Sequence, residues 1–379
     1  MKKLFIYTPY WSTWGGGEKY VLTLAAVLSK FEETFVTILS TCPDITKDEL
    51  SKFVNLNINK IQLLSSSNYE DLAKQISSDS IFVCLSNFRV YRSSAKHNIQ
   101  ILQVPYGPIS TSTMVKKLFS GKLKESIKDI YRKALLEYSR TAVDMVLTNS
   151  GFVHDVLQRH HRIQSDVLYP PIQDFMMATF HKKKYILSVG RFFRGLYNEK
   201  RYDILTEAFR HIYKTGIKDW EYHIIGTAFT DKKTQKYLYS LQKINEGYPV
   251  YFHVNADYNT LVQLYNEASI FWHAAGYGID ESKEPERVEH FGMTTVEAMS
   301  AGCIPVVINK GGQREIITDG VNGILWDNVD QLISRTMDVI QNKINTEIIR
   351  KEARQRALDF SFEKFSQRVV DLFSNIINI

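Results

Sequence analysis

Short apolar runs alternate with segments of helical period along most of the chain. In the first half, five runs rich in β-branched and aromatic residues predict strands, at residues 4–7, 35–39, 61–64, 81–85 and 100–104. The segments between them carry apolar residues at helix spacing. This alternation predicts an α/β fold with a parallel sheet and helices on both faces.

The same pattern begins again after Pro170-Pro171, and paired prolines resist both helix and sheet. Further strands are predicted at 144–150, before the prolines, and beyond them at 185–191, 222–226, 250–254, from 270 onward and at 303–308. We therefore predict two Rossmann-like domains, an N-terminal domain of residues 1–170 and a C-terminal domain of residues 171–360.

The composition is that of an ordinary globular protein, with 379 residues, 44% hydrophobic and 23% charged. A net charge of +6 suits a polyanionic small ligand or an anionic membrane surface, and the charge alone does not distinguish between them. Three scattered cysteines predict neither a disulfide framework nor a zinc site, and favour the cytoplasm. No apolar run reaches the roughly 18 residues of a spanning helix, and the N-terminal run is too short for a signal peptide.

The most informative stretch is residues 289–302, where seven residues separate Glu289 from Glu297. Gly292 allows a ligand to approach the backbone, and a helix is predicted to begin directly after it. Amides at a helix start bind anions, and three are expected to be free here, those of Met293, Thr294 and Thr295. Glu297 has a second interpretation, because Thr294-Thr295-Val296-Glu297 also fits a capping box. The capping box explains neither Glu289 nor Gly292.

At these residues the chain resembles family 4 glycosyltransferases, retaining enzymes of the GT-B fold whose hallmark is two glutamates with this separation. Glu289-His290-Phe291-Gly292 is similar to the branch of lipid-linked-oligosaccharide mannosyltransferases that use GDP-mannose. The resemblance implies that Glu289 contacts hydroxyls of the donor sugar, that Glu297 contacts the ribose, and that Phe291, Gly292, Met293 and Thr294 cradle the donor. It also implies that the helix of residues 361–379 packs back on the first domain.

A Gly-Arg pair ends the strand predicted at 185–191, and Lys200 follows in the next loop. Arg191 and Lys200 match the family's arginine and lysine that hold the donor diphosphate, although both could simply be solvated charges. Two cations would stabilise the charge that develops on a nucleoside diphosphate leaving group. The chain has no Asp-x-Asp triplet, so we expect neither a metal nor a cofactor, with the nucleotide sugar as co-substrate. Alanine at Glu289 or Lys200 is expected to lower turnover and leave the fold intact.

Four further residues are candidates for contact with the substrates. Gly16 and Gly17 follow the first strand, where the resemblance implies a donor or acceptor contact and a plain β–α turn is the alternative. Gln103 stands where relatives often carry a histidine beside the reacting sugar, and glutamine cannot act as a base. His273 could touch the sugar or pack in the core, and packing is slightly favoured.

Four other segments carry expectations. Residues 255–258 are expected to frame the base, residues 280–287 to form a mobile flap, and Gly311 and Gly312 to admit sugar or diphosphate. Residues 116–140 form a basic amphipathic segment with charges of +8 − 3 = +5. It either lies on an anionic bilayer, on the inner face of the membrane, or is a solvated helix packed on the sheet.

These observations predict a retaining glycosyltransferase. It would move a hexose, with mannose the best guess, to a hydroxyl of a glycan or lipid-linked acceptor in cell-surface polysaccharide or glycolipid synthesis. A soluble synthase acting on a sugar phosphate is one alternative. A non-catalytic nucleotide-sugar-binding protein is another, kept open by Gln103. No nucleic acid is expected as a partner.

Overall fold

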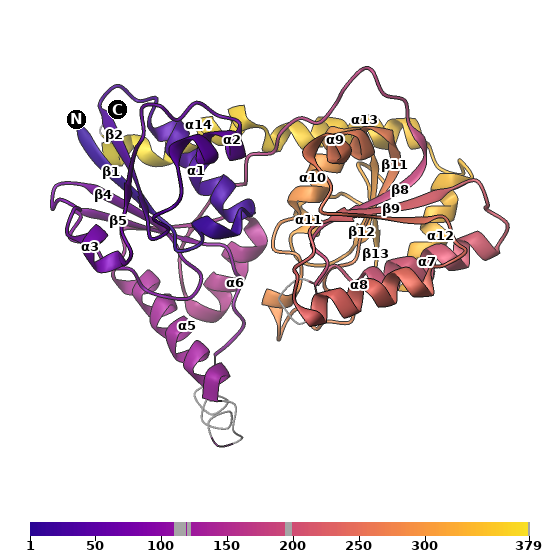
Figure 1. Ribbon diagram of the computed structural model, residues 1–379, viewed down its shortest axis with the longest axis horizontal. Coiled ribbons are helices and arrows are strands. Elements are labelled where there is room, and N and C mark those ends of the chain that lie inside the picture. Colours follow the sequence, from indigo (N-terminus) through magenta and orange to yellow (C-terminus); the bar gives the residue numbers. More distant parts are fainter. Residues whose placement is uncertain (110–118, 120–122, 194–198, 378–379) are drawn as a thin grey trace. The chain divides into compact units, whose positions relative to one another are not determined.

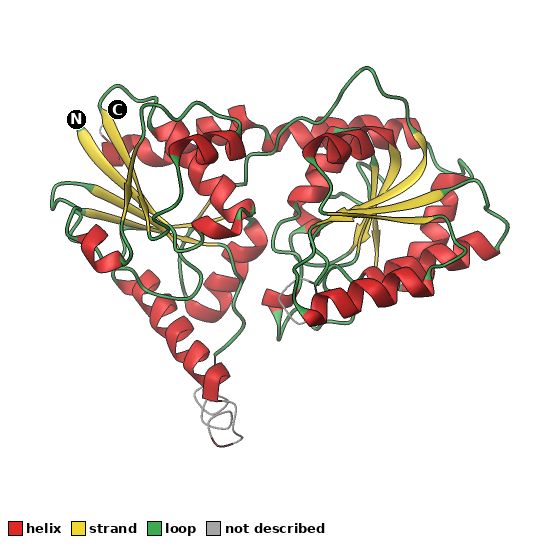
Figure 2. Ribbon diagram, viewed as in Figure 1, coloured by secondary structure: helices red, strands yellow, loops and turns green. Residues whose placement is uncertain are grey.

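The computed structural model describes residues 1–109, 119, 123–193 and 199–377. The chain forms two compact units, Met1–Pro171 with Phe362–Ile379, and Ile172–Ser361. Each unit is a parallel sheet with helices on both faces (Figures 1 and 2). Two Rossmann-like α/β units are therefore present, as the alternating pattern predicted.

The first sheet has the strand order β3-β2-β1-β4-β5-β6-β7, all parallel. Its strands are β1 Lys2–Tyr7, β2 Thr34–Ser40, β3 Gln62–Ser65, β4 Ile81–Leu85, β5 His97–Leu102, β6 Met145–Thr148 and β7 Asp166–Val167. The two-residue β7 was not predicted, because it is too short to show a pattern. The order of connection reverses between β1 and β4.

The helices of the first unit are α1 Gly16–Leu28, α2 Lys47–Val54, α3 Tyr69–Ala73, α5 Leu123–Thr141, α6 Gly151–His161 and α14 Phe362–Ile377, with the short η1 Trp11–Thr13. α1 is almost wholly buried in the main core. α14 adds Phe365, Val369 and Phe373 to that core, and the Phe365 ring lies 5.7 Å from that of Tyr20 on α1. The C-terminal helix thus belongs to the first unit.

The second sheet has the order β10-β9-β8-β11-β12-β13. Its strands are β8 Lys183–Val189, β9 Glu221–Gly226, β10 Val250–Val254, β11 Ala268–His273, β12 Ile304–Ile308 and β13 Ile324–Trp326. Around it lie α7 Tyr202–Lys214, α8 Lys232–Ile244, α9 Tyr258–Glu267, α10 Met293–Ser300, α11 Gln313–Ile316, α12 Val329–Ile340, α13 Thr346–Ala357, η2 Pro285–Arg287 and η3 Leu358–Phe360. The order reverses between β8 and β11, and ligands of such sheets bind at the carboxyl ends of strands beside this point.

Helix starts differ in a way that bears on function. Ser, Thr, Asp or Asn side chains cap α2, α3, α6, α8, α9, α12 and α13. α10 instead has Gly292 at its N-cap, which provides no capping side chain. In the described part of the chain, no helix is long and apolar enough to cross a bilayer.

Candidate functional site

The carboxyl ends of β8 and β11 bring three predicted residues together in the second unit. Lys200 Nζ lies 2.5 Å from Glu289 Oε2, and His273 Nε2 lies 2.9 Å from the same oxygen. Lys200 Nζ is also 3.3 Å from His273 Nε2. His273 is the last residue of β11, whereas Lys200 precedes α7 and Glu289 precedes α10. Residues as far apart as 89 positions in sequence thus converge at the reversal point.

Glu289 is only 9% exposed, and its neighbours keep it ionised. Burial by itself raises the pKa of this carboxyl, but the charge of Lys200 and the hydrogen bond from His273 outweigh it and hold the pKa well below its usual range. A buried carboxylate with a matched cation is a fixed acceptor for hydroxyl groups rather than a proton donor.

His273 is buried and neutral. Burial, followed by the positive charge of Lys200, lowers its pKa. Because an ionised carboxylate only accepts hydrogen bonds, Nε2 of His273 must carry the proton that points to Glu289. Nδ1 is then an acceptor, and it has no partner among the described residues. His273 is buried and also orients Glu289.

Gly190 and Arg191 directly follow β8. Gly190 has a φ of +155°, and an added Cβ would lie 2.9 Å from Cε of Lys200. The stem of Lys200 therefore crosses a position where only glycine fits. Arg191 is half-buried, and its guanidinium makes no hydrogen bond or ion pair with another described residue. A cation without a partner at this edge is available to an anionic ligand.

Three residues after Glu289 lies Gly292, the N-cap of α10, whose φ is +120°. The amides of Met293 and Thr294 have no acceptor in the described part of the chain, as predicted. The amide of Thr295 is not free, because it donates to the carbonyl of Gly292 at 3.0 Å in the first helical turn. Two unpaired amides at a helix start still provide an anion-binding site.

The capping-box interpretation of Glu297 is wrong. The helix begins two residues earlier than that motif requires, so Glu297 lies beyond the first turn. Its Oε2 accepts a hydrogen bond of 2.7 Å from the Tyr265 hydroxyl. Burial and the Glu297 carboxylate raise the pKa of Tyr265 well above 10, so the phenol keeps its proton. Tyr265 lies inside the helical pattern of α9 and gave no sequence signal.

Two expectations about neighbouring residues need correction. The Phe291 ring is 2% exposed and lies 5.2 Å from the ring of Phe360, so its side chain fills the core rather than meeting a donor. Gly311 and Gly312 make room for the chain itself. An added Cβ would lie 2.2 Å from the carbonyl oxygen of Glu289 at Gly311, and 2.5 Å from Cα of Phe291 at Gly312.

Several buried polar atoms around this site lack partners within the described residues. Besides Nδ1 of His273, these are the hydroxyl of Thr295 and both amide atoms of Gln313. Gln313 is fully buried, and its Nε2 would lie 2.9 Å from a Cβ at Gly292. Unpaired buried polar groups are costly, and their concentration here marks a functional region. Gln313 was not among the residues predicted for the site.

The remaining candidates, Gly16, Gly17 and Gln103, lie together in the first unit. α1 begins at Gly16, and Oε1 of Gln103 would lie 3.0 Å from a Cβ at Gly17. The Gln103 amide therefore sits against the start of α1. In the same turn, Glu18 accepts a hydrogen bond from the amide of Gly15 at 2.6 Å, so this carboxylate serves the helix start.

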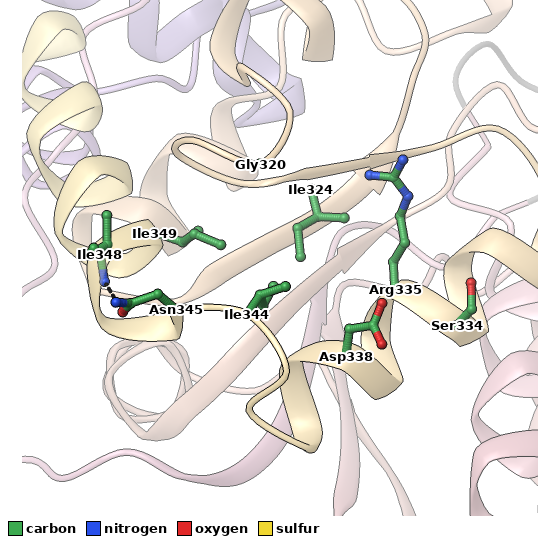
Figure 3. A pocket seen from close by; sticks show the side chains of 9 residues that line it. All are labelled: Gly320, Ile324, Ser334, Arg335, Asp338, Ile344, Asn345, Ile348 and Ile349. Atoms are coloured by element: carbon green, nitrogen blue, oxygen red, sulfur yellow. Dashed lines mark hydrogen bonds between the residues drawn. The ribbon is translucent and has the colours of Figure 1, made fainter.

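A separate cavity of about 500 Å³ lies in the second unit between β13, α12 and α13 (Figure 3). Its lining includes the apolar side chains of Ile324, Ile344 and Ile349, together with Arg335 and Asp338 of α12. None of the predicted site residues lines it. Nor do three or more metal-ligating side chains gather in a suitable geometry anywhere in the described residues.

Comparisons with known proteins agree with this architecture. Residues 172–356, which lie within the second unit, match the family model of glycosyl transferases group 1. An uncharacterised glycosyltransferase of Methanocaldococcus jannaschii is 24% identical over 246 residues, covering 64% of this chain and 62% of that protein. The GDP-Man:Man(3)GlcNAc(2)-PP-Dol alpha-1,2-mannosyltransferase of Yarrowia lipolytica is 28% identical over 191 residues, which are 45% of this chain and 28% of the relative.

Solved structures match over almost the whole length. Anabaena HepE in complex with UDP and glucose has a TM-score of 0.68 at 14% identity, covering 99% of this chain and 100% of that one. WaaG, a glycosyltransferase involved in lipopolysaccharide biosynthesis, has a TM-score of 0.65 at 13% identity, covering 98% and 99%. The fold is therefore GT-B, as predicted. The chain spans less than two thirds of the first curated relatives it matches, at 62%, 33% and 20% of their lengths.

Proposed function

We propose that the protein transfers a hexose from a nucleoside diphosphate sugar to a hydroxyl group, and that the second unit holds the donor. The observation that carries this proposal is the Lys200–Glu289–His273 cluster, which lies at the strand-order reversal of a glycosyltransferase group 1 domain. Arg191 and the amides at the start of α10, which have no partner among the described residues, supply positive charge at the same edge of the sheet.

Each residue then has a distinct role in the transfer. Arg191, Lys200 and the α10 amides hold the diphosphate and stabilise the charge that develops as it leaves. Glu289, kept ionised, accepts hydrogen bonds from hydroxyls of the donor sugar. Lys200 gives part of its charge to Glu289 and retains N–H groups for a phosphate oxygen. Glu297, held by Tyr265, binds the ribose, and residues 255–258 frame the base.

We further propose GDP-mannose as the donor, retention of the anomeric configuration, and transfer without a metal or covalent nucleophile. The leaving phosphate oxygen would take the proton of the acceptor hydroxyl. The Glu-His-Phe-Gly motif and the Yarrowia mannosyltransferase support mannose. A UDP-sugar is the competing donor, because the similar Anabaena structure contains UDP. The acceptor would be a glycan or lipid-linked sugar of cell-surface polysaccharide or glycolipid synthesis.

Donor consumption by purified protein tests this function. GDP-mannose and UDP-glucose would each be supplied with and without acceptor, and released nucleoside diphosphate measured. Arg191→Ala should lower the rate by about 10²–10³, the usual effect of losing one such donor. Arg335→Ala removes the same charge from α12, at the cavity in Figure 3, and should react at the wild-type rate. An Arg191→Ala rate equal to the wild type contradicts the assignment.

A non-catalytic nucleotide-sugar-binding protein is the second candidate. It is favoured by Gln103, which follows β5 and whose amide lies against the start of α1. A glutamine amide can hydrogen-bond a sugar but cannot accept its proton. If the wild-type protein binds nucleoside diphosphates yet consumes neither donor with any acceptor, this second function replaces the first.

We also propose that α5 contacts an anionic membrane from the cytoplasmic side. In its first turns, apolar side chains face outward and polar side chains face inward. Leu123, Ile127 and Ile130 are 53%, 42% and 53% exposed, whereas Ser126 and Asp129 are buried. Phe119, just before the helix, is 85% exposed. The last turns of α5 pack inward through Leu135 and Leu136, as the alternative of a solvated helix packed on the sheet expects, whereas its first turns leave apolar side chains exposed. Residues 116–118 and 120–122 of the predicted segment lie outside the described residues.

Exposed lysines accompany this apolar face, at 124, 128 and 133. α5 extends away from the sheet of its unit in Figure 1. Vesicle sedimentation at low salt tests the contact with phosphatidylglycerol bilayers. Replacing Ile127 and Ile130 with Gln should release most of the protein, whereas Phe35→Gln, at another exposed apolar position on β2, should not. Absence of wild-type binding contradicts the membrane proposal.

A further inference from the structure

The segment of residues 276–288, which contains the stretch 280–287 expected to be a mobile flap, packs against the loop after β12. Glu281 Oε2 accepts a hydrogen bond from the amide of Gly311 at 2.9 Å, and its Oε1 lies 2.6 Å from Arg314 Nη1. Lys310 Nζ donates to the carbonyl of Ile279. Near the start of the segment, the carbonyl of Tyr277 accepts a hydrogen bond of 2.7 Å from Arg201, the residue after Lys200.

The loop held by Glu281 is in direct contact with the backbone of Glu289. The amide of Gly312 donates to the carbonyl of Glu289 at 2.9 Å. Gly311 and Gly312 leave no space for a side chain between the two stretches of backbone. A displacement of Gly311 would therefore move Glu289, whose carboxylate joins Lys200 and His273.

We propose that Glu281 is a positioning residue for Glu289. Its carboxylate binds an amide and a guanidinium at once, and such charge-assisted bonds are shorter and stronger than neutral ones. The Glu281 side chain is 25% exposed, which limits the screening of its charge by water. The consequence for turnover rests on the proposed function of the site.

Amide exchange and kinetics together test this role in the full chain. In Glu281→Ala, exchange of the 310–313 amides should rise about tenfold, as expected from the loss of a charge-assisted hydrogen bond. kcat for donor consumption should fall about tenfold to a hundredfold with little change in KM, because the reacting groups are misplaced rather than removed. Glu281→Gln keeps an acceptor for Gly311 and should recover most of kcat.

Glu284→Ala provides the matched control. Glu284 lies in the same segment but pairs locally with Arg287 at 2.9 Å, so both readouts should stay at wild-type values. Unchanged exchange in Glu281→Ala overturns the proposal, and so does raised exchange with an unchanged kcat. If the wild-type protein consumes no donor, the proposed function fails, and exchange of the peptide containing Glu289 decides the positioning role by itself.

Discussion

At the scale of single residues, Glu289 and Lys200 depend on one another. Their side chains are 12% and 14% exposed, so neither charge is well solvated when the other is removed. This pairing revises the expectation that alanine at either position leaves the fold intact. Activity lost in a single variant could reflect unfolding as well as lost chemistry.

A double-mutant cycle separates these effects. Lys200→Met should destabilise the protein by about 3–5 kcal/mol, because it leaves a buried carboxylate without its counter-charge. Combining it with Glu289→Gln should restore part of that loss, since the double variant buries no unpaired charge. Urea unfolding measures the free energy of unfolding of the two single variants and of the double variant. If the loss in the double variant equals the sum of the two single losses, the two side chains do not interact.

The neutral state of His273 predicts a pH dependence. Its pKa in the folded protein is lowered from an ordinary value of about 6.5, so folding favours the uncharged ring. The associated stability is complete above that value and is lost as pH falls toward the lowered pKa. The pKa of Glu289 is also depressed, so its contribution to stability is complete above about pH 4.3 and is lost only as pH falls below that value.

Between pH 7 and pH 5, the wild-type protein should therefore lose more stability than His273→Gln, which has no group to protonate there. Glutamine retains an N–H for Glu289, so the two proteins should be similar at pH 7. Unfolding midpoints in urea at several pH values provide the comparison. Parallel pH profiles would mean that His273 is protonated equally in both states.

At the scale of elements, the stretch before α10 and the loop before α11 are in contact through their backbones. Gly312 has an ordinary φ, so its need for glycine comes from the neighbouring chain and not from its own conformation. An added Cβ would lie 2.5–2.6 Å from atoms of His290 and Phe291. These contacts leave little freedom to the segment that carries Glu289.

Gly312→Ala should accordingly cost about 3 kcal/mol by overpacking and reduce turnover. Gly320→Ala is the matched substitution, because Gly320 has a φ of +74° but no atom within 4 Å of an added Cβ. It should cost only about 1–2 kcal/mol of backbone strain and leave turnover unchanged. Thermal unfolding and donor consumption measure both. Equal effects of the two variants would argue against a tight contact.

Local sequence patterns predicted most of the helices and strands, but not which residues of other segments pack against them. Apolar runs located the longer strands, whereas β7 and β13 were too short to be recognised. The amphipathic pattern of α5 was visible, yet only the structure shows that Ile127 and Ile130 face outward. Gly311 and Gly312 were recognised as close-approach glycines and assigned to a ligand, because sequence does not reveal which backbone lies opposite.

At the scale of the whole molecule, the two parallel sheets and the GT-B fold followed from alternation and from motif resemblance. The cluster at the reversal point of the second sheet did not, since it depends on Lys200 meeting Glu289 across 89 residues. Glu281 and Gln313 were overlooked for the same reason. Their importance lies in contacts that form only when distant segments fold together.

The central claim is that the second unit binds a diphosphate through Arg191, Lys200 and the amides at the start of α10. Isothermal titration of the full chain with GDP, GMP, UDP and UMP tests it most directly. We predict that one diphosphate binds at least about tenfold more tightly than its monophosphate, a difference of about 1.4 kcal/mol, and that Arg191→Ala removes the preference. Equal affinity for diphosphate and monophosphate, or no binding of either, would contradict the account.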